Sequence, residues 1–125
     1  MKIVYIAGAY TGNNFEEIDA NIKKAEAFAV ALANRGIGFF CPHLNTAHFE
    51  TKSTATYEFY LEMNLAILDR CDGMLLMPGW ETSRGAMGEY LHVQSGNKNI
   101  KMFFPFPGLP GDTRVLDAIE KWAKG

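Results

Sequence analysis

Short runs of apolar residues alternate along the chain with segments in which apolar residues recur at every third or fourth position. A continuous apolar run is typical of a strand covered on both faces, and the longer periodicity is typical of an amphipathic helix. Strands are expected at residues 3–7, 37–41, 74–77 and 100–104. Helices are expected from about residue 13 or 14 to 36, from 56 to 70, from 82 or 83 to 96, and from 112 onward.

Strands that alternate with helices form parallel sheets, because right-handed crossovers start each strand from the same edge. We therefore predict an α/β fold, a three-layer sandwich in which helices cover both faces of a mostly parallel sheet of four to five strands. The 125 residues show no repeat, linker or low-complexity tract. A length of this order is typical of one domain, so a single domain is expected over residues 1–125.

The expected first helix carries signals at both of its ends. Asn13 or Asn14 can cap its start, and Glu16 or Glu17 stands three residues further on, as in a capping box. Gly36 follows the last periodic residue and is expected to end the helix.

Three loops are expected to meet at one edge of the sheet. They follow Ala7, Cys41 and Met77, each at the carboxyl end of an expected strand. Open α/β sheets bind ligands at this edge, near the point where the strand order switches. The second loop includes residues 43–54, which show no periodicity, and a loop of that length in a compact domain is usually functional.

The composition narrows the classes of partner. Apolar residues make up 48% of the chain and charged residues 21%, which argues against disorder. The net charge of -2 provides no broad basic surface for nucleic acid. No apolar run approaches the ~20 residues of a membrane span. The N-terminus runs directly into a strand pattern without a cleavage site, so we expect no signal peptide and a cytoplasmic protein.

Cysteine and histidine do not form a recognisable metal or disulfide pattern. Cys41 and Cys71 each lie beside an apolar run, which is typical of reduced thiols in a core. His43, His48 and Glu50 lie in a polar loop without a cysteine pair or an H-E-x-x-H helix. We expect no metal.

Gly8 and Gly12 mark the turn that follows the first strand. Glycine in such a turn lets the backbone approach a ligand closely, although any α/β protein needs tight turns. The spacing is not G-x-G-x-x-G, and no acidic residue stands where a dinucleotide fold contacts the ribose. We therefore expect no nicotinamide cofactor, and no other cofactor is indicated.

The segment from Ser83 to Glu89 has the most distinctive composition in the chain. Ser83 and Arg84 open a helix, whose free N–H groups and positive dipole end suit an anion. A hydroxyl and a guanidinium would add donors for a phosphate. Gly85 and Gly88 lie inside this helix, where each costs about 1 kcal/mol relative to alanine. Either a closely packed backbone or the space needed by a ligand would offset that cost.

Glu89 follows Gly85 by one helical turn, so the glycine would leave open space beside the carboxylate. Ser83 lies roughly 9 Å before Glu89 along the helix axis, a spacing that suits a 5′-phosphate and a sugar carbon. The alternative is that Thr82 and Ser83 form an ordinary helix cap and Glu89 is a solvated surface residue.

The order of several short motifs resembles the nucleoside 2-deoxyribosyltransferase-like superfamily. The motifs are Ile3-Val4-Tyr5-Ile6-Ala7-Gly8, Cys41-Pro42-His43, Asn64-Leu65, Asp72-Gly73 and Ser83…Gly85…Glu89. This superfamily includes nucleoside deoxyribosyltransferases and nucleoside 5′-monophosphate N-glycosidases, and the chain looks most like a small, little-characterised single-domain branch of it. The resemblance covers nearly the whole chain and implies a flavodoxin-like, or Rossmann-like, sandwich.

The resemblance also implies roles for individual residues. Glu89 takes the position of the nucleophile that forms a glycosyl-enzyme ester, and Ser83 takes the position that holds a 5′-phosphate. Deoxyribosyltransferases, which act on unphosphorylated nucleosides, have aspartate at the latter position. Gly8 and Tyr10 fall in the loop that lines the sugar pocket. Members of the family form homodimers or larger homo-oligomers.

The chain departs from the family at Asn64, where the characterised enzymes carry an aspartate. Asparagine cannot exchange a proton, so a general acid for the departing base is missing from this position. Asp69 or Asp72 could substitute, and the alternative for both is capping or surface solvation. A base could stack on Trp80 or Tyr10.

We expect cleavage or transfer at the N-glycosidic bond of a (deoxy)nucleoside 5′-monophosphate, by an N-glycosidase or a deoxyribosyltransferase. The catalytic candidates are Glu89, Asn64 and Asp72. The candidates for binding the substrate are Gly8, Tyr10, Trp80, Ser83, Arg84 and Gly85. The alternative is a non-catalytic nucleotide-binding module that has lost turnover.

Overall fold

The secondary structure follows the expected alternation of strands and helices. The computed structural model describes residues 1–96, 99–105 and 113–125. Its strands are β1 (Ile3–Ala7), β2 (Gly38–Phe40), β3 (Gly73–Leu76) and β4 (Lys101–Phe103). Its helices are α1 (Phe15–Asn34), α2 (Pro42–Asn45), α3 (Tyr57–Leu68), α4 (Arg84–Gly96) and α5 (Arg114–Lys124), with short 3-10 helices η1 (Phe49–Thr51) and η2 (Trp80–Thr82).

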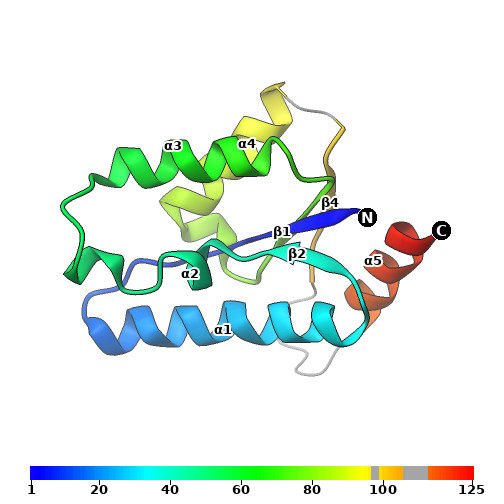
Figure 1. Ribbon diagram of the computed structural model, residues 1–125, viewed down its shortest axis with the longest axis horizontal. Helices are drawn as coiled ribbons and strands as arrows, with labels where there is room; N and C mark the ends of the chain where they lie inside the picture. The colour runs from blue at the N-terminus through cyan, green and yellow to red at the C-terminus, as the bar shows by residue number, and fades with distance from the viewer. Residues whose placement is uncertain (97–98, 106–112) are drawn as a thin grey trace.

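The four strands form one parallel sheet in the order β2-β1-β3-β4 (Figure 1). The chain starts in the middle of the sheet, adds β2 on one side, and then crosses over to add β3 and β4 on the other. This arrangement confirms the α/β class and the parallel sheet. The switch in strand order lies at β1, so its carboxyl end is the expected place for a ligand.

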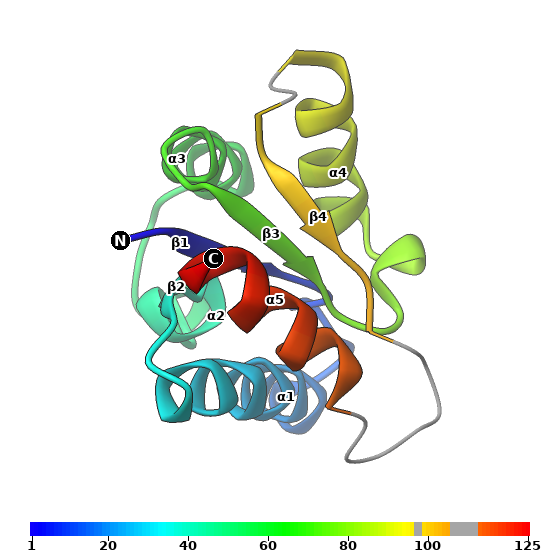
Figure 2. The same cartoon turned by 90° about the vertical axis from the view of Figure 1, so that its right-hand side faces the viewer.

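Helices cover both faces of the sheet, with α1 and α5 on one side and α3 and α4 on the other (Figure 2). Alternate side chains of β1 pack against the helices on opposite faces of the sheet. Val4 and Ile6 pack in the cluster that includes residues of α1 and α5. Tyr5 and Ala7 pack in the opposite cluster, with residues of α3 and α4. The three-layer sandwich predicted from the continuous apolar run is confirmed.

Hydrogen bonds and backbone conformation at the two ends of α1 show which residues cap it. Asn14 is the N-cap, and its side chain accepts a hydrogen bond from the backbone N–H of Glu17 at 2.9 Å. The Glu17 carboxylate in turn accepts from the backbone N–H of Asn13 at 3.0 Å. Gly36 follows the helix with a φ of +68°, a conformation that glycine adopts without strain. Asp112, where the last helix was expected to start, lies outside the described residues.

Residues 43–54 are not the continuous loop that the sequence indicated. They contain most of the short helix α2 and all of η1. Pro42 is the first residue of α2, a position that lacks an intrahelical N–H bond and therefore tolerates proline. Helices of four and three residues are too short to produce a hydrophobic period, which is why the pattern did not reveal them.

No helix within the described ranges combines the length and the apolar character that a membrane crossing requires.

Candidate active site

A cleft of about 560 Å³ opens at the carboxyl end of β1. This volume is within the usual range for small-molecule sites. Its walls come from the turn after β1, from α2 and η1, and from the facing ends of α3 and α4. Side chains or backbone of these segments that line it include Gly8, Tyr10, Thr11, Gly12, His43, Thr46, Phe49, Glu50, Tyr57, Tyr60, Leu61, Asn64, Ser83, Arg84, Gly85, Ala86 and Glu89. Seven of the expected site residues therefore meet in one place: Gly8, Tyr10, Asn64, Ser83, Arg84, Gly85 and Glu89.

Glu89 is a buried carboxyl group in the wall of this cleft, only 7% exposed. The tyrosine hydroxyl of Tyr5 donates a hydrogen bond to its Oε2 atom. Burial raises the pKa of Glu89 from 4.5 to about 7, while the hydrogen bond from Tyr5 acts in the opposite direction. The alternative of a solvated surface residue is wrong, because burial and a specific partner both hold this side chain.

Tyr5, the hydrogen-bond partner of Glu89, is a candidate site residue that the sequence did not reveal. It lies in β1 on the face covered by α3 and α4, and its side chain is fully buried. Burial first, and the Glu89 carboxylate second, raise the pKa of Tyr5 well above its ordinary value of 10. The hydroxyl therefore stays protonated and acts as a donor. A tyrosine in an otherwise aliphatic buried strand was the available signal, since a buried hydroxyl needs a partner.

Ser83 immediately precedes α4 and serves as its N-terminal cap. Its Oγ atom accepts a hydrogen bond from the backbone N–H of Ala86 at 3.2 Å. The capping alternative is therefore correct for Ser83, but the hydroxyl proton remains available as a donor. Arg84 lies with its guanidinium 5.5 Å from the ring centre of Tyr57. Both residues line the cleft, next to the first N–H groups of the helix.

The two glycines of α4 differ in their surroundings. A Cβ atom added at Gly85 would lie 3.5 Å from the Tyr57 hydroxyl, with no other atom within 4 Å. Gly85 lines the cleft between Ser83 and Glu89, so its missing side chain leaves room for a ligand. A Cβ at Gly88 would meet nothing within 4 Å. Close packing explains neither glycine.

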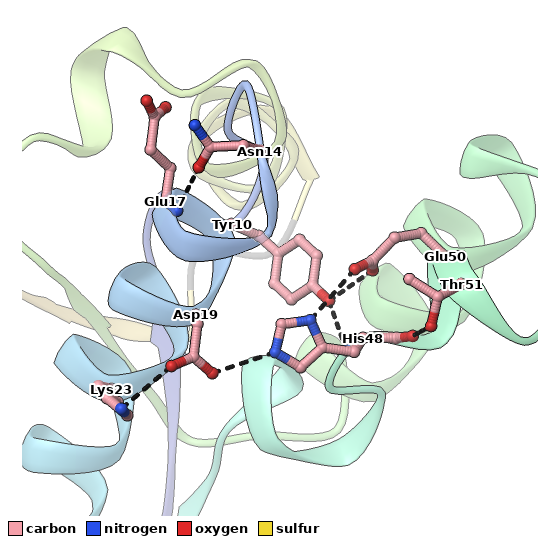
Figure 3. Close-up of polar contacts among 8 residues, drawn as sticks. All are labelled: Tyr10, Asn14, Glu17, Asp19, Lys23, His48, Glu50 and Thr51. Atoms are coloured by element: carbon pink, nitrogen blue, oxygen red, sulfur yellow. Dashed lines mark hydrogen bonds and ion pairs between the residues drawn. The ribbon is translucent and has the colours of Figure 1, made fainter.

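The turn after β1 brings Gly8 and Tyr10 to the cleft. A Cβ at Gly8 would overlap the terminal methyl group of Met77 and lie 3.1 Å from its Cβ atom, so an added side chain would require Met77 to shift. The Tyr10 hydroxyl donates to Glu50 at 2.6 Å and accepts from the backbone N–H of His48 at 2.8 Å (Figure 3). Burial and the hydrogen bond to Glu50 raise the pKa of Tyr10. These contacts tie residues 48–50 to the turn.

His43 fixes the same turn from the other side. It is 3% exposed, and its Nε2 atom lies 3.0 Å from the backbone carbonyl of Ala9. Burial lowers the pKa of His43, so the ring is neutral at pH 7 and Nε2 donates to the carbonyl.

Two polar side chains of α3 also face the cleft. Asn64 and Tyr60 lie one helical turn apart and both line it. The Oδ1 atom of Asn64 and the hydroxyl oxygen of Tyr60 are buried and have no hydrogen-bond partner within the described part of the chain. Buried polar atoms are normally paired, so these two are suited to bind polar groups of a ligand.

Asp72 does not reach the cleft. Its Oδ2 atom accepts a hydrogen bond from the backbone N–H of Ile3, the first residue of β1, at 2.8 Å. The cleft lies beyond the other end of that strand, ~16 Å away for five residues. Asp72 stabilises the amino edge of the sheet, and its inclusion among the catalytic candidates is corrected. Asp69 contacts His92 at 2.8 Å, and neither residue lines the cleft.

Trp80 also lies outside the cleft lining. Its ring packs 4.7 Å from Tyr90 and 6.0 Å from Phe104, measured between ring centres. The proposed stacking of a base on Trp80 is therefore corrected, and Tyr10 is the one of the two aromatic candidates that lines the cleft. Across the described ranges, no group of three or more potential metal ligands comes together.

A family model described as a domain of unknown function (DUF4406) matches residues 2–102. The chain belongs to this family. The match covers all the residues that line the cleft and leaves α5 outside it. A search of curated proteins found no match.

Among solved structures, this DUF4406 protein is similar to a 2-deoxyribosyltransferase from Bacillus psychrosaccharolyticus. The TM-score is 0.51 at 16% sequence identity, and the alignment covers 86% of this chain and 75% of the other. An identity this low establishes a common fold. It confirms the Rossmann-like or flavodoxin-like arrangement expected from the sequence.

Proposed function

We propose that this protein cleaves or transfers the N-glycosidic bond of a (deoxy)nucleoside 5′-monophosphate. One observation carries the proposal: a buried carboxyl group, Glu89, faces a nucleotide-sized cleft and is held by the Tyr5 hydroxyl. The shared fold with a 2-deoxyribosyltransferase, and the resemblance of the sequence motifs, support the same chemistry.

Glu89 acts as the nucleophile. The hydrogen bond from Tyr5 engages Oε2 and orients the carboxylate, so that Oε1 attacks the anomeric carbon. The bond from this carbon to the base breaks through an oxocarbenium-like transition state, and a glycosyl ester of Glu89 forms. Water or a second base then attacks the same carbon and releases the carboxylate. The pKa of about 7 means that a large share of Glu89 is ionised at neutral pH.

The start of α4 binds the 5′-phosphate. Ser83 presents its hydroxyl proton, Arg84 its guanidinium, and the first turn of the helix its N–H groups and dipole. Glu89 follows Ser83 by six positions, so the phosphate and the anomeric carbon fit roughly 9 Å apart along the helix. Gly85 leaves the space between them open.

The sugar lies between Glu89 and the turn that carries Gly8 and Tyr10, and Asn64 contacts the sugar or the base. The aromatic side chains Tyr57 and Phe59 are 41% and 52% exposed at the start of α3. Two exposed aromatic rings at the start of α3 suit a contact between subunits, so we propose a homo-oligomer. One domain is sufficient for the whole site.

The test is to incubate the purified protein with a panel of nucleosides and nucleoside 5′-monophosphates and to measure release of free base. We expect release from at least one monophosphate. Saturable nucleotide binding without release from any compound would refute the enzyme and support a binding module.

A further inference from the structure

Breaking a glycosidic bond to a nucleobase leaves an electron pair on a ring nitrogen. Protonation of that nitrogen by a positioned acid typically contributes 10²–10⁴-fold to the rate. Asn64 carries an amide, whose N–H groups are not acidic enough to transfer a proton to the base. Asp72 lies at the opposite edge of the sheet, and Asp69 pairs with His92 outside the cleft. The source of the proton must therefore lie elsewhere in the cleft.

Glu50 is a second carboxyl group in the cleft wall. Of the described residues that line the cleft, only Glu50 and Glu89 are carboxylic acids. Glu50 lies in η1, and its side chain is 39% exposed. Its Oε1 atom accepts the hydrogen bond from Tyr10, which holds the carboxyl group against the turn after β1. The hydrogen bond from Tyr10 therefore fixes the position of the Glu50 carboxyl group in the cleft wall, although the side chain is partly exposed.

His48 lies beside Glu50 and is held in place from two sides. Its Nε2 atom lies 3.1 Å from Asp19 on α1 (Figure 3), and its ring is stacked on Phe15, with ring centres 4.1 Å apart. Its Nδ1 atom lies 3.5 Å from Oε2 of Glu50 and forms no hydrogen bond within the described residues. The polar side chains of Asp19, His48 and Glu50 thus lie in sequence between α1 and the cleft.

We propose that Glu50 is the acid–base residue of this cleft, giving a proton to the departing base and taking one from the attacking water. The inference rests on the proposed function. In the first step, Oε1 of Glu89 bonds to the anomeric carbon, the carbon–nitrogen bond breaks, and the Glu50 proton moves to the ring nitrogen. In the second step, the Glu50 carboxylate takes a proton from water, whose oxygen bonds to the anomeric carbon. The ester bond to Glu89 breaks, and its electron pair returns to the carboxylate.

The experiment compares Glu50→Gln with the unaltered protein on two substrates. The first is the nucleoside 5′-monophosphate found in the panel assay. The second is a deoxyribose 5-phosphate carrying 4-nitrophenolate, a leaving group that departs without a proton. We expect the variant to lose about 10²–10⁴-fold in kcat on the nucleotide. On the nitrophenyl substrate, formation of the ester should change by less than about threefold.

Controls separate this role from a structural one. Glutamine keeps an oxygen acceptor for Tyr10, and the thermal unfolding temperature reports whether the loop wall is intact. Glu58→Gln, on the exposed first turn of α3, should leave both rates unchanged. Equal losses of Glu50→Gln on both substrates would assign Glu50 to structure or binding and overturn the proposal. Full activity of this variant on the nucleotide would overturn it while leaving the proposed function in place.

Discussion

The cleft contains two hydrogen bonds of the same chemical type in different surroundings. Tyr5 donates to Glu89 inside the molecule, where both side chains are under 10% exposed. Tyr10 donates to Glu50 at the rim, where the glutamate side chain is 39% exposed. Burial of the first pair places the pKa of Glu89 at about 7. Two pairs of the same chemistry thus differ in depth, and the depth of a pair decides how strongly burial acts on its carboxylate.

The two pairs also differ in what holds them. The inner pair joins a central strand to α4, both of which are packed in the core. The outer pair joins a turn to a short 3-10 helix and depends on neighbours such as His48. We therefore expect substitutions in the inner pair to act on the chemical step, and those in the outer pair to act on the loop wall and on proton transfer.

The largest expected effect is that of Glu89→Gln. The amide keeps an oxygen acceptor for Tyr5 but cannot form the glycosyl ester, so base release should fall by at least about 10³-fold. Unfolding by heat checks that the variant is folded. If Glu89→Gln released base at the normal rate, Glu89 would have no part in the mechanism.

The next largest effect is expected in the pH dependence of stability, which the inner pair of Tyr5 and Glu89 should dominate. The folded protein keeps a proton on Glu89 between pH 4.5 and about 7, where the unfolded chain loses it. Stability should therefore fall as the pH rises through this range, by up to roughly 3 kcal/mol relative to Glu89→Gln. Urea unfolding of both proteins at pH 4.5 and pH 8 measures this difference. A parallel pH dependence in the two proteins would contradict the raised pKa.

Tyr5→Phe should shift the ionisation of the nucleophile. Removing the hydroxyl removes a hydrogen bond that lowers the pKa of Glu89, so this pKa should rise further. The acid limb of the kcat/KM profile should then move to higher pH, with a loss of about tenfold at pH 7, or ~1.4 kcal/mol. Tyr10→Phe is the matched control in the outer pair. An identical shift of the acid limb in both variants would show that the two pairs are not distinct.

Ser83→Ala is expected to act on substrate binding, with a loss of kcat/KM no larger than that of Tyr5→Phe. Loss of one hydrogen-bond donor to a phosphate should reduce kcat/KM for monophosphates by about tenfold and leave unphosphorylated nucleosides unaffected. Loss of the cap should also cost ~1 kcal/mol of stability. Thr82→Ala is the control, because Thr82 bonds to the carbonyl of Gly79 and does not line the cleft. Equal losses on both substrate classes would remove Ser83 from phosphate binding.

Much of the fold could be predicted from local patterns. The continuous apolar run of β1 implied helices on both faces, and Asn14 and Gly36 marked the ends of α1. The short helices α2 and η1 could not be predicted, because a hydrophobic period needs more residues than they contain. Distance along the chain also misled the choice of Asp72, which follows Asn64 closely but turns to the opposite edge of the sheet.

The sequence by itself determined the parallel sandwich, the edge of the sheet at which the cleft lies, and the glycine that opens space before Glu89. These depend on periodicity and on residue type, which are properties of short segments. Only the tertiary structure decided that Glu89 is buried, that Tyr5 is its partner, and that Glu50 faces the same cleft. Tyr5 and Glu89 are 84 residues apart, and a contact across that distance depends on the packing of α4 against the sheet.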